Sequence, residues 1–286
     1  MKNRNNLVIY LLLACVVFFY LIIAAVLTNS PLMPVPVHVA APPPVHTSTP
    51  SPVLPVIGLF AAVIAIGYIL GSLPFGLWIS LAFTGKDVRK VGSGKIGMTN
   101  VMRVGGKKWA FISLALDMAK SAFAVLCASL IFGSGYVDTL GISTSLSSIA
   151  MVVAALTAIA GHNWSIFLKF KGGRGVATFI GGLIVMYWPA AVISGILTLV
   201  IGFRTRYMSM GSIIGAVFAF ILLMTFSILQ ITFLNNYPPA YVYMVYAMVG
   251  AIFIYVIHRD NVVRLLSGTE RKIGEKSDGD QSGSLM

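Results

Sequence analysis

Long apolar runs separated by short polar loops occupy most of this chain of 286 residues. The runs lack the strict alternation that marks strands of a membrane barrel, so the pattern favours helices. A helix needs about 20 apolar residues to cross a bilayer, and it satisfies its own backbone hydrogen bonds there. The pattern predicts an all-α, polytopic helical membrane protein with apolar helices over 7–27, 56–83, 109–132, 149–161, 176–203, 207–233 and 239–257.

The run over 176–203 has a proline, Pro189, near its middle. Arg174 stands before this run, and Arg204 and Arg206 stand after it. One straight span would put these cations on opposite faces of the membrane, whereas basic loops normally share the cytoplasmic face. We therefore predict a short hairpin of two thin helices broken at Pro189. The chain then has a seven-helix core plus one extra N-terminal transmembrane helix.

Composition divides the chain into four parts. Residues 1–28 are predicted to form an N-terminal transmembrane anchor. Residues 29–55 hold nine of the 13 prolines and no charged side chain, which predicts an extended, Pro-rich extracytoplasmic linker. The membrane core is predicted over 56–267 and a polar cytoplasmic tail over 268–286.

Basic residues outnumber acidic residues by 20 to 8, and their distribution predicts the orientation. The predicted outer segments 29–55, 133–148 and 234–238 contain no Lys or Arg. Every basic residue except Lys120 falls on the opposite face. This asymmetry predicts that both termini and all cationic loops are cytoplasmic. Nucleic-acid binding is not expected, because the basic residues are not interleaved with stacking aromatic side chains on a soluble face.

The most distinctive loop spans 86–108 and holds seven basic residues and five glycines. Glycine allows positive φ angles, which turn successive N–H groups into a nest for anions such as phosphate. The Gly92-x-Gly94-x-x-Gly97 spacing does not indicate a dinucleotide site, because an apolar helix precedes it instead of a strand. A P-loop is excluded because Ile96 stands where Ser or Thr is required. The loop either binds a phosphorylated substrate or is only a positively charged loop with turn glycines.

A second cationic glycine loop spans 161–178 and repeats this chemistry, with Lys171, Gly172, Gly173 and Arg174 in sequence. Two loops of this kind on one face favour a phosphate site there.

Asp117 and Lys120 lie three residues apart, and so on one face of a predicted helix. A lysine at membrane depth costs about 3 kcal/mol unless it is paired or lies in a wet cavity. Lys120 either forms a structural ion pair with Asp117 or points to a substrate phosphate while Asp117 orients it. Ser72, beside the helix kink expected at Pro74, either faces a polar site or belongs to a packing notch of small residues.

Six stretches together carry a family resemblance. They are 71–76, 87–94, Asp117-x-x-Lys120, 161–178, Arg206-Tyr207-x-Ser209 and 258–270. Through them, residues 56–273 resemble the bacterial acyl-phosphate-dependent glycerol-3-phosphate acyltransferases, a seven-helix membrane family with cytoplasmic motif loops. The resemblance implies a multi-pass protein of the bacterial inner membrane with its active site on the cytoplasmic face.

The resemblance also implies the reaction. An acyl chain passes from acyl phosphate to the 1-hydroxyl of glycerol-3-phosphate, giving lysophosphatidic acid and phosphate in the first step of phospholipid synthesis. The expected partners are these two substrates and the lipid bilayer, with no cofactor and no metal. Acyl phosphate is already activated, so no covalent nucleophile is required. No histidine of the chain belongs to a His-x4-Asp motif.

Catalysis is expected to rest on positioning and on cationic stabilisation of developing charge, with Arg89, Lys120 and His162 as the catalytic residues. The hydroxyl proton passes either to a substrate phosphate oxygen or to a histidine base, conventionally His162, with His258 as the other plausible imidazole. The residues expected to bind substrate phosphate come from all the motif loops: Ser72, Arg89, Ser93, Gly94, Lys95, Asn100, Lys120, Lys171, Gly172, Gly173, Arg174, Asn261 and Glu270.

The chain departs from the family pattern at two positions of the first loop. Lys95 stands where the family usually has Asn, and Met98 stands where it usually has Ala. An amide both donates and accepts hydrogen bonds, whereas an ammonium only donates. A catalytically altered relative is therefore one alternative. The other is a transporter of a phosphorylated anion, which predicts charges on both faces or broken helices at the midplane.

Overall fold

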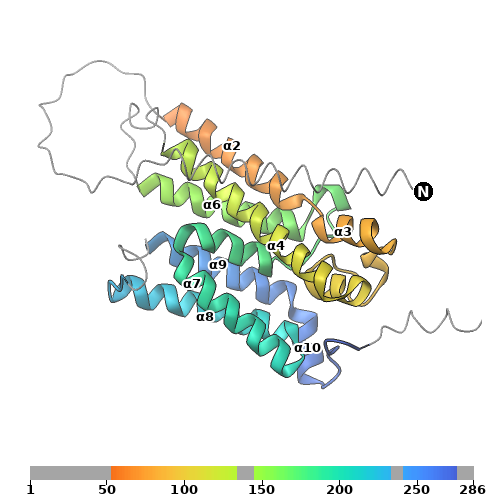
Figure 1. Cartoon of the computed structure of the whole chain (residues 1–286). Helices are drawn as coiled ribbons and strands as arrows, with labels where there is room; N and C mark the ends of the chain where they lie inside the picture. The colour runs from red at the N-terminus through yellow and green to blue at the C-terminus, as the bar shows by residue number, and fades with distance from the viewer. Residues whose placement is uncertain (1–52, 134–144, 233–240, 276–286) are drawn as a thin grey trace, which may run out of the picture.

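The computed structural model describes residues 53–133, 145–232 and 241–275. The predicted anchor over 1–28 and nearly all of the linker over 29–55 lie outside these residues. Helices dominate the described part of the chain (Figure 1). They are α2 (Val53–Ser72), α3 (Phe75–Thr84), α4 (Met98–Phe132), α6 (Ser145–Asn163), α7 (Val176–Thr205), α8 (Met208–Ile228), α9 (Tyr241–Ile257) and α10 (Arg259–Leu266), with short 3-10 turns at Val88–Lys90 and Ile166–Leu168.

The helices form a bundle in which α2 packs on α6, α4 packs on α6 and α7, and α8 packs on α7 and α9. Figure 1 shows α3 and α10 at the same end of this bundle. Five of the described helical segments are long and apolar enough to cross a membrane, and a sixth is added if α9 and α10, bent by 62°, are counted as one. The prediction of an all-α polytopic membrane protein is confirmed.

The first predicted break is confirmed at Pro74, where α2 ends and α3 begins. Proline has no N–H and disrupts the helix before it, which frees carbonyl groups. Two of them find side-chain donors: Ser165 Oγ donates to the Ser72 carbonyl at 2.6 Å, and Lys120 Nζ donates to the Leu73 carbonyl at 3.0 Å. Gly71 lies so close to the backbone of Ala158 in α6 that a Cβ would collide with it. The notch therefore packs α2 on α6, as one of the two interpretations expected.

The start of α4 corrects a prediction. The helix was expected to begin at Trp109, but it begins at Met98, and a non-helical residue, Gly106 (φ 80°, ψ −176°), interrupts it. Glycines and cations between these positions lowered the apparent hydrophobicity, so the sequence pattern resembled a loop. The consequence is that one helical segment over 98–105 carries Asn100 and Arg103 at the end of the bundle.

The predicted hairpin is confirmed in α7, with its break at Tyr187 (φ −158°, ψ 87°), two residues before Pro189. Gly195 lies beside Ile180, since a Cβ built on Gly195 is 3.6 Å from Ile180 Cγ2. In a straight helix these residues would be about 22 Å apart along the axis. The two halves, 176–186 and 188–205, therefore run back along each other. Arg174 and Arg206 accordingly lie at the same end.

Candidate active site

A cavity of about 350 Å³ opens where α4, α7, α8 and α10 meet. Its two ends differ in chemistry. One end is polar and is lined by Ser93, Lys95, Asn100, Arg103, Asp117, His162, Arg174, Ser209, His258, Asn261, Arg264, Glu270 and Arg271. The other end is apolar and lies mainly between the two halves of α7, where Ile180, Ile184, Ala191, Val192, Gly195, Ile196 and Leu199 line it.

Asn100 organises the first loop. Its buried amide nitrogen lies within hydrogen-bond distance of three carbonyls, those of Val88 (2.8 Å), Val91 (2.7 Å) and Lys95 (2.9 Å). The loop bends with positive φ angles at Gly92 (58°) and Gly94 (67°), which glycine adopts without strain. Asn100 thus fixes the backbone that carries the cavity-lining Ser93 and Lys95.

The N-terminus of α4 also faces the cavity. Gly97, Met98 and Thr99 line it, and no side chain caps the first turn of this helix. The first N–H groups of a helix have no intrahelical partners, and the helix dipole makes this end positive. An anion in the cavity would therefore meet free donors as well as cationic side chains.

Arg89 lies outside the cavity lining and pairs with a neighbour in its own turn. Its Nη2 is 2.7 Å from Asp87 Oδ2, and its side chain is 45% exposed. The hydrogen bond from Arg89 holds the pKa of Asp87 below its ordinary value. A phosphate-binding role for Arg89 stays a prediction, because this pair would have to open first.

Lys120 is fully buried and does not line the cavity. Its ammonium lies 2.8 Å from Asp117 Oδ1, 2.8 Å from His162 Nδ1 and 3.0 Å from the Leu73 carbonyl. An ammonium can only donate, so His162 Nδ1 accepts and the imidazole proton lies on Nε2. Lys120 therefore stands behind Asp117 and His162, which do line the cavity, and its contact with phosphate stays a prediction.

The second loop contributes Arg174, together with Gly175, Val176 and Ala177 at the N-terminus of α7. The N–H groups of Gly172 and Gly173 donate to the carbonyls of Asn163 (3.0 Å) and His162 (2.9 Å). They cap the C-terminus of α6 and so are not free to bind phosphate in this structure. Lys171 lies outside the cavity lining, and Arg174 lines it. Burial and the nearby arginines lower the pKa of Arg174 to about 10, so it stays charged at neutral pH.

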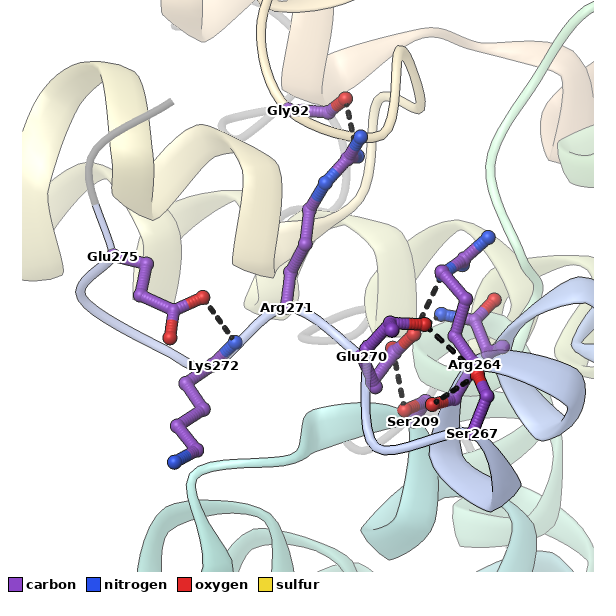
Figure 2. A network of polar contacts seen from close by, with 10 residues as sticks. Gly92, Ser209, Arg264, Ser267, Glu270, Arg271, Lys272 and Glu275 are labelled. Atoms are coloured by element: carbon purple, nitrogen blue, oxygen red, sulfur yellow. Dashed lines mark hydrogen bonds and ion pairs between the residues drawn. The ribbon is translucent and has the colours of Figure 1, made fainter. Parts of the chain in front are cut away.

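The third cluster is centred on Glu270, whose side chain is 6% exposed. Figure 2 shows Arg264 and Ser209 beside it. Its carboxylate accepts hydrogen bonds from Ser209 Oγ (2.8 Å), Asn261 Nδ2 (2.6 Å) and Arg264 Nε (2.8 Å). Burial acts to raise the pKa of Glu270, but these donors hold it below its ordinary value. Glu270 thus orders the groups around the cavity as an anion, rather than binding an anion itself.

His258, the second histidine considered as a base, also lines the cavity. It is buried between α9 and α10, and its Nδ1 donates to the Ile254 carbonyl at 2.8 Å. A neutral imidazole with its proton on Nδ1 keeps Nε2 as an acceptor. Of the two described histidines at the cavity, His258 is therefore the one with a free acceptor nitrogen.

The charges of the lining favour an anionic ligand. Five lining residues are cations, and two, Asp117 and Glu270, are carboxylates. Asp117 pairs with Lys120, and Glu270 pairs with Arg264. Among the ion pairs of the described residues, none neutralises the remaining four lining cations, which are Lys95, Arg103, Arg174 and Arg271.

Comparison with known proteins identifies the family. The family described as Glycerol-3-phosphate acyltransferase matches residues 61–268 of the chain. The chain belongs to this family. It is 43% identical over 215 residues to Glycerol-3-phosphate acyltransferase 3 of Dehalococcoides mccartyi (strain ATCC BAA-2266 / KCTC 15142 / 195), covering 75% of this chain and 96% of that relative. This membership favours the enzyme over the transporter alternative.

Two solved structures are similar in fold. Both are crystal structures of PlsY (YgiH), an integral membrane glycerol 3-phosphate acyltransferase. The glycerol 3-phosphate form gives a TM-score of 0.59 at 32% identity and covers 75% of this chain and 96% of that one. The lysophosphatidic acid form gives 0.57 at 31% identity, with 75% and 95% covered.

The structure gathers about half of the expected site residues at the cavity. Those that line it are Ser93, Lys95, Asn100, His162, Arg174, Asn261 and Glu270, whereas Ser72, Arg89, Gly94, Lys120, Lys171, Gly172 and Gly173 do not. The lining residues Arg103, Ser209, Arg264 and Arg271 were not among the expected site residues. All except Arg103 and Arg271 lie in the quoted motifs, and Arg103 follows Asn100 at the helical spacing of three, so these were the available signals.

Proposed function

We propose that this member of the family transfers an acyl chain from acyl phosphate to the 1-hydroxyl of glycerol-3-phosphate, yielding lysophosphatidic acid and phosphate. The observation that carries the proposal is one cavity with a cationic end and an apolar end. Both substrates bear a phosphate, and one of them bears a long apolar chain. The four unneutralised cations suit two phosphate groups, and the open N-terminus of α4 adds backbone donors for one of them.

The acyl chain is placed in the groove between the two halves of α7. Val192 and Ile196 line this groove and are 44% and 57% exposed, so the groove opens toward lipid. An acyl phosphate can then enter from the bilayer with its headgroup at the cationic end. Glycerol-3-phosphate, which has no apolar chain, enters from water at the polar mouth.

Acyl transfer needs no covalent intermediate in this arrangement. The 1-hydroxyl oxygen attacks the acyl carbonyl carbon, the bond from that carbon to the phosphate oxygen breaks, and phosphate leaves. The hydroxyl proton passes to a substrate phosphate oxygen, so charge and atoms balance. Two features support this route over His162 as the base: its Nδ1 already accepts from Lys120, and its Nε2 carries the proton. His258 is placed to orient the hydroxyl through its free Nε2.

We place the reaction at the cytoplasmic face of the bacterial cell membrane. The first loop, Arg174 and the tail all meet at one end of the bundle, through contacts such as that between Arg271 and Gly92. Cationic loops gathered at one end are typical of the cytoplasmic side. Lys95 and Met98 both line the cavity, so the altered-relative alternative concerns substrate contacts directly.

The donor assignment is tested by supplying purified protein with glycerol-3-phosphate and either palmitoyl phosphate or palmitoyl coenzyme A. We expect lysophosphatidic acid only with the acyl phosphate, because its phosphate is what the cationic end binds. Formation from the thioester at a comparable rate would contradict the donor assignment. Formation from neither would contradict the proposed function.

A further inference from the structure

The chain beyond α10 closes over the polar end of the cavity as a short strap, residues 269–273. One end is fixed by Glu270, which accepts hydrogen bonds from Ser209, Asn261 and Arg264. Figure 2 shows Glu270 with Ser209 and Arg264. The other end is fixed at Ile273, whose N–H donates to the Arg206 carbonyl at 2.8 Å, while Arg206 Nη2 donates to the Ile273 carbonyl at 2.8 Å. Arg271 lies between these two anchors.

Arg271 joins the strap to the first loop. Figure 2 shows its side chain extending from the strap to Gly92, and its Nη1 donates to the Gly92 carbonyl at 2.6 Å. This bond links residues 179 positions apart in the chain. Gly92 opens the turn that leads through Ser93 and Lys95 to the N-terminus of α4. A bond that holds Gly92 therefore holds the cavity wall that follows it.

A second guanidinium approaches the same glycine. Arg103 Nη1 lies 3.2 Å from a Cβ built on Gly92, and both Arg103 and Arg271 line the cavity. Arg103 and Arg271 repel each other, and the nearby carboxylates of Glu270 and Glu275 offset part of this repulsion. Planar guanidinium groups suit phosphate oxygens, which they can bind in pairs. The arrangement therefore becomes more favourable when a phosphate is present.

We propose that Arg271 is a positioning residue that holds the strap closed on the first loop, and that a substrate phosphate bound between Arg103 and Arg271 stabilises this closure. The inference rests on the proposed function for the identity of that phosphate. Arg271 lies outside residues 61–268, the part of the chain that matches the family. The strap is therefore more ordered when a phosphate occupies the cationic end of the cavity.

Kinetics of Arg271→Gln test the positioning role, with Arg259→Gln as the matched control. Arg259 pairs only with Asp260 among the ion pairs of the described residues, and both side chains are more than three-quarters exposed. We expect Arg271→Gln to raise KM for glycerol-3-phosphate about tenfold with a smaller change in kcat, because a charge-assisted but solvent-exposed bond is lost. Arg271→Lys should show a smaller rise in KM than Arg271→Gln, because lysine keeps the positive charge although it lacks the planar guanidinium group. Equal KM values for Arg271→Gln and Arg259→Gln would overturn the inference.

Closure of the strap is measured by adding a lysine-specific protease and monitoring cleavage after Lys272 by mass spectrometry. In the wild type, inorganic phosphate or glycerol-3-phosphate should slow this cleavage. In Arg271→Gln the cleavage should be faster and insensitive to either compound, while Arg259→Gln should behave as the wild type. Identical cleavage in all three proteins overturns the strap even if lysophosphatidic acid is formed. Slower cleavage with phosphate in a wild type that forms no lysophosphatidic acid supports the strap and contradicts the proposed function.

Discussion

The buried lysine of α4 is satisfied by residues from three parts of the chain. Lys120 forms an ion pair with Asp117 and donates hydrogen bonds to His162 Nδ1 and the Leu73 carbonyl. The spacing of three residues predicted the partner on the same helix. It did not predict the other two, because they lie 42 and 47 positions away and meet Lys120 only after α2, α4 and α6 have packed.

Removing this lysine is expected to destabilise the fold more than it harms contacts in the cavity. Lys120→Met leaves Asp117 buried without its cation, which costs about 3–5 kcal/mol. The double variant Asp117→Asn/Lys120→Met should recover much of that loss, because the buried charge is removed as well. Thermal unfolding in detergent measures the stability of the single and of the double variant. A Lys120→Met protein that unfolds at the wild-type temperature would show that the pair is not structural.

Glu270 makes the stability of the polar end depend on pH. Its pKa in the folded protein is lowered, so it contributes stability above its ordinary value of 4.5, and this contribution is lost as pH falls through the lowered pKa. Glu270→Gln should lower the unfolding temperature near neutral pH by removing about 1–2 kcal/mol of hydrogen bonding. The difference between the two proteins should shrink in acid. A difference that stays constant from pH 7 to about pH 3 would contradict this assignment.

Among the elements, α7 shows what a sequence pattern can and cannot locate. The proline and the flanking arginines predicted a hairpin, and the structure has one. The break lies at Tyr187 because the ring of a helical proline clashes with the carbonyl four residues earlier, here that of Val185, so the distortion falls before Pro189. The pairing of Gly195 with Ile180 could not be predicted, since it depends on the angle of the bend.

The groove in α7 gives a test at this scale. Gly195→Trp should fill the space beside Ile180 and displace the acyl chain. A misplacement of about 1 Å at the reacting atoms can cost on the order of 100-fold in rate, so a loss of at least tenfold is expected with palmitoyl phosphate. Val200→Trp is the control, because Val200 is 50% exposed on the same half-helix and does not line the cavity. Equal activity of the two variants would show that the acyl chain does not bind in this groove.

At the scale of the whole molecule, charge and hydrophobicity predicted most of the architecture. Charge and hydrophobicity decide whether a segment lies in lipid or in water, and both can be read directly from its residues. Glu270 contacts Ser209, 61 positions away, and Arg271 contacts Gly92. These contacts depend on the conformation of the loops, which could not be predicted from the sequence. The motif resemblance selected the first loop, the second loop and the segment around Glu270, which meet at the cavity. It did not separate residues that line the cavity, such as Arg174, from residues that support it, such as Gly173.

The acyltransferase core is expected to work without the N-terminal segment. The family match covers residues 61–268, and every residue of the cavity lies within or just beyond it. A chain beginning at Val56 should therefore insert, fold and retain turnover within about twofold of the full chain, because the reacting groups and their supports are unchanged. Activity assays on the purified truncation check this. A truncation that inserts and folds normally but is inactive would show that residues 1–55 contribute to the site.

The most direct test of the account compares the turnover of the wild type with that of Arg174→Gln, His162→Ala and His258→Ala. Lysophosphatidic acid and phosphate are quantified together, with palmitoyl phosphate and glycerol-3-phosphate as substrates. We predict equimolar products from the wild type and a larger loss for Arg174→Gln than for either histidine variant, because cationic stabilisation and a substrate phosphate carry the reaction. Loss of a general base typically costs about 100- to 10,000-fold. A histidine variant that binds both substrates normally yet loses turnover by more than Arg174→Gln would contradict the account and identify that histidine as the base.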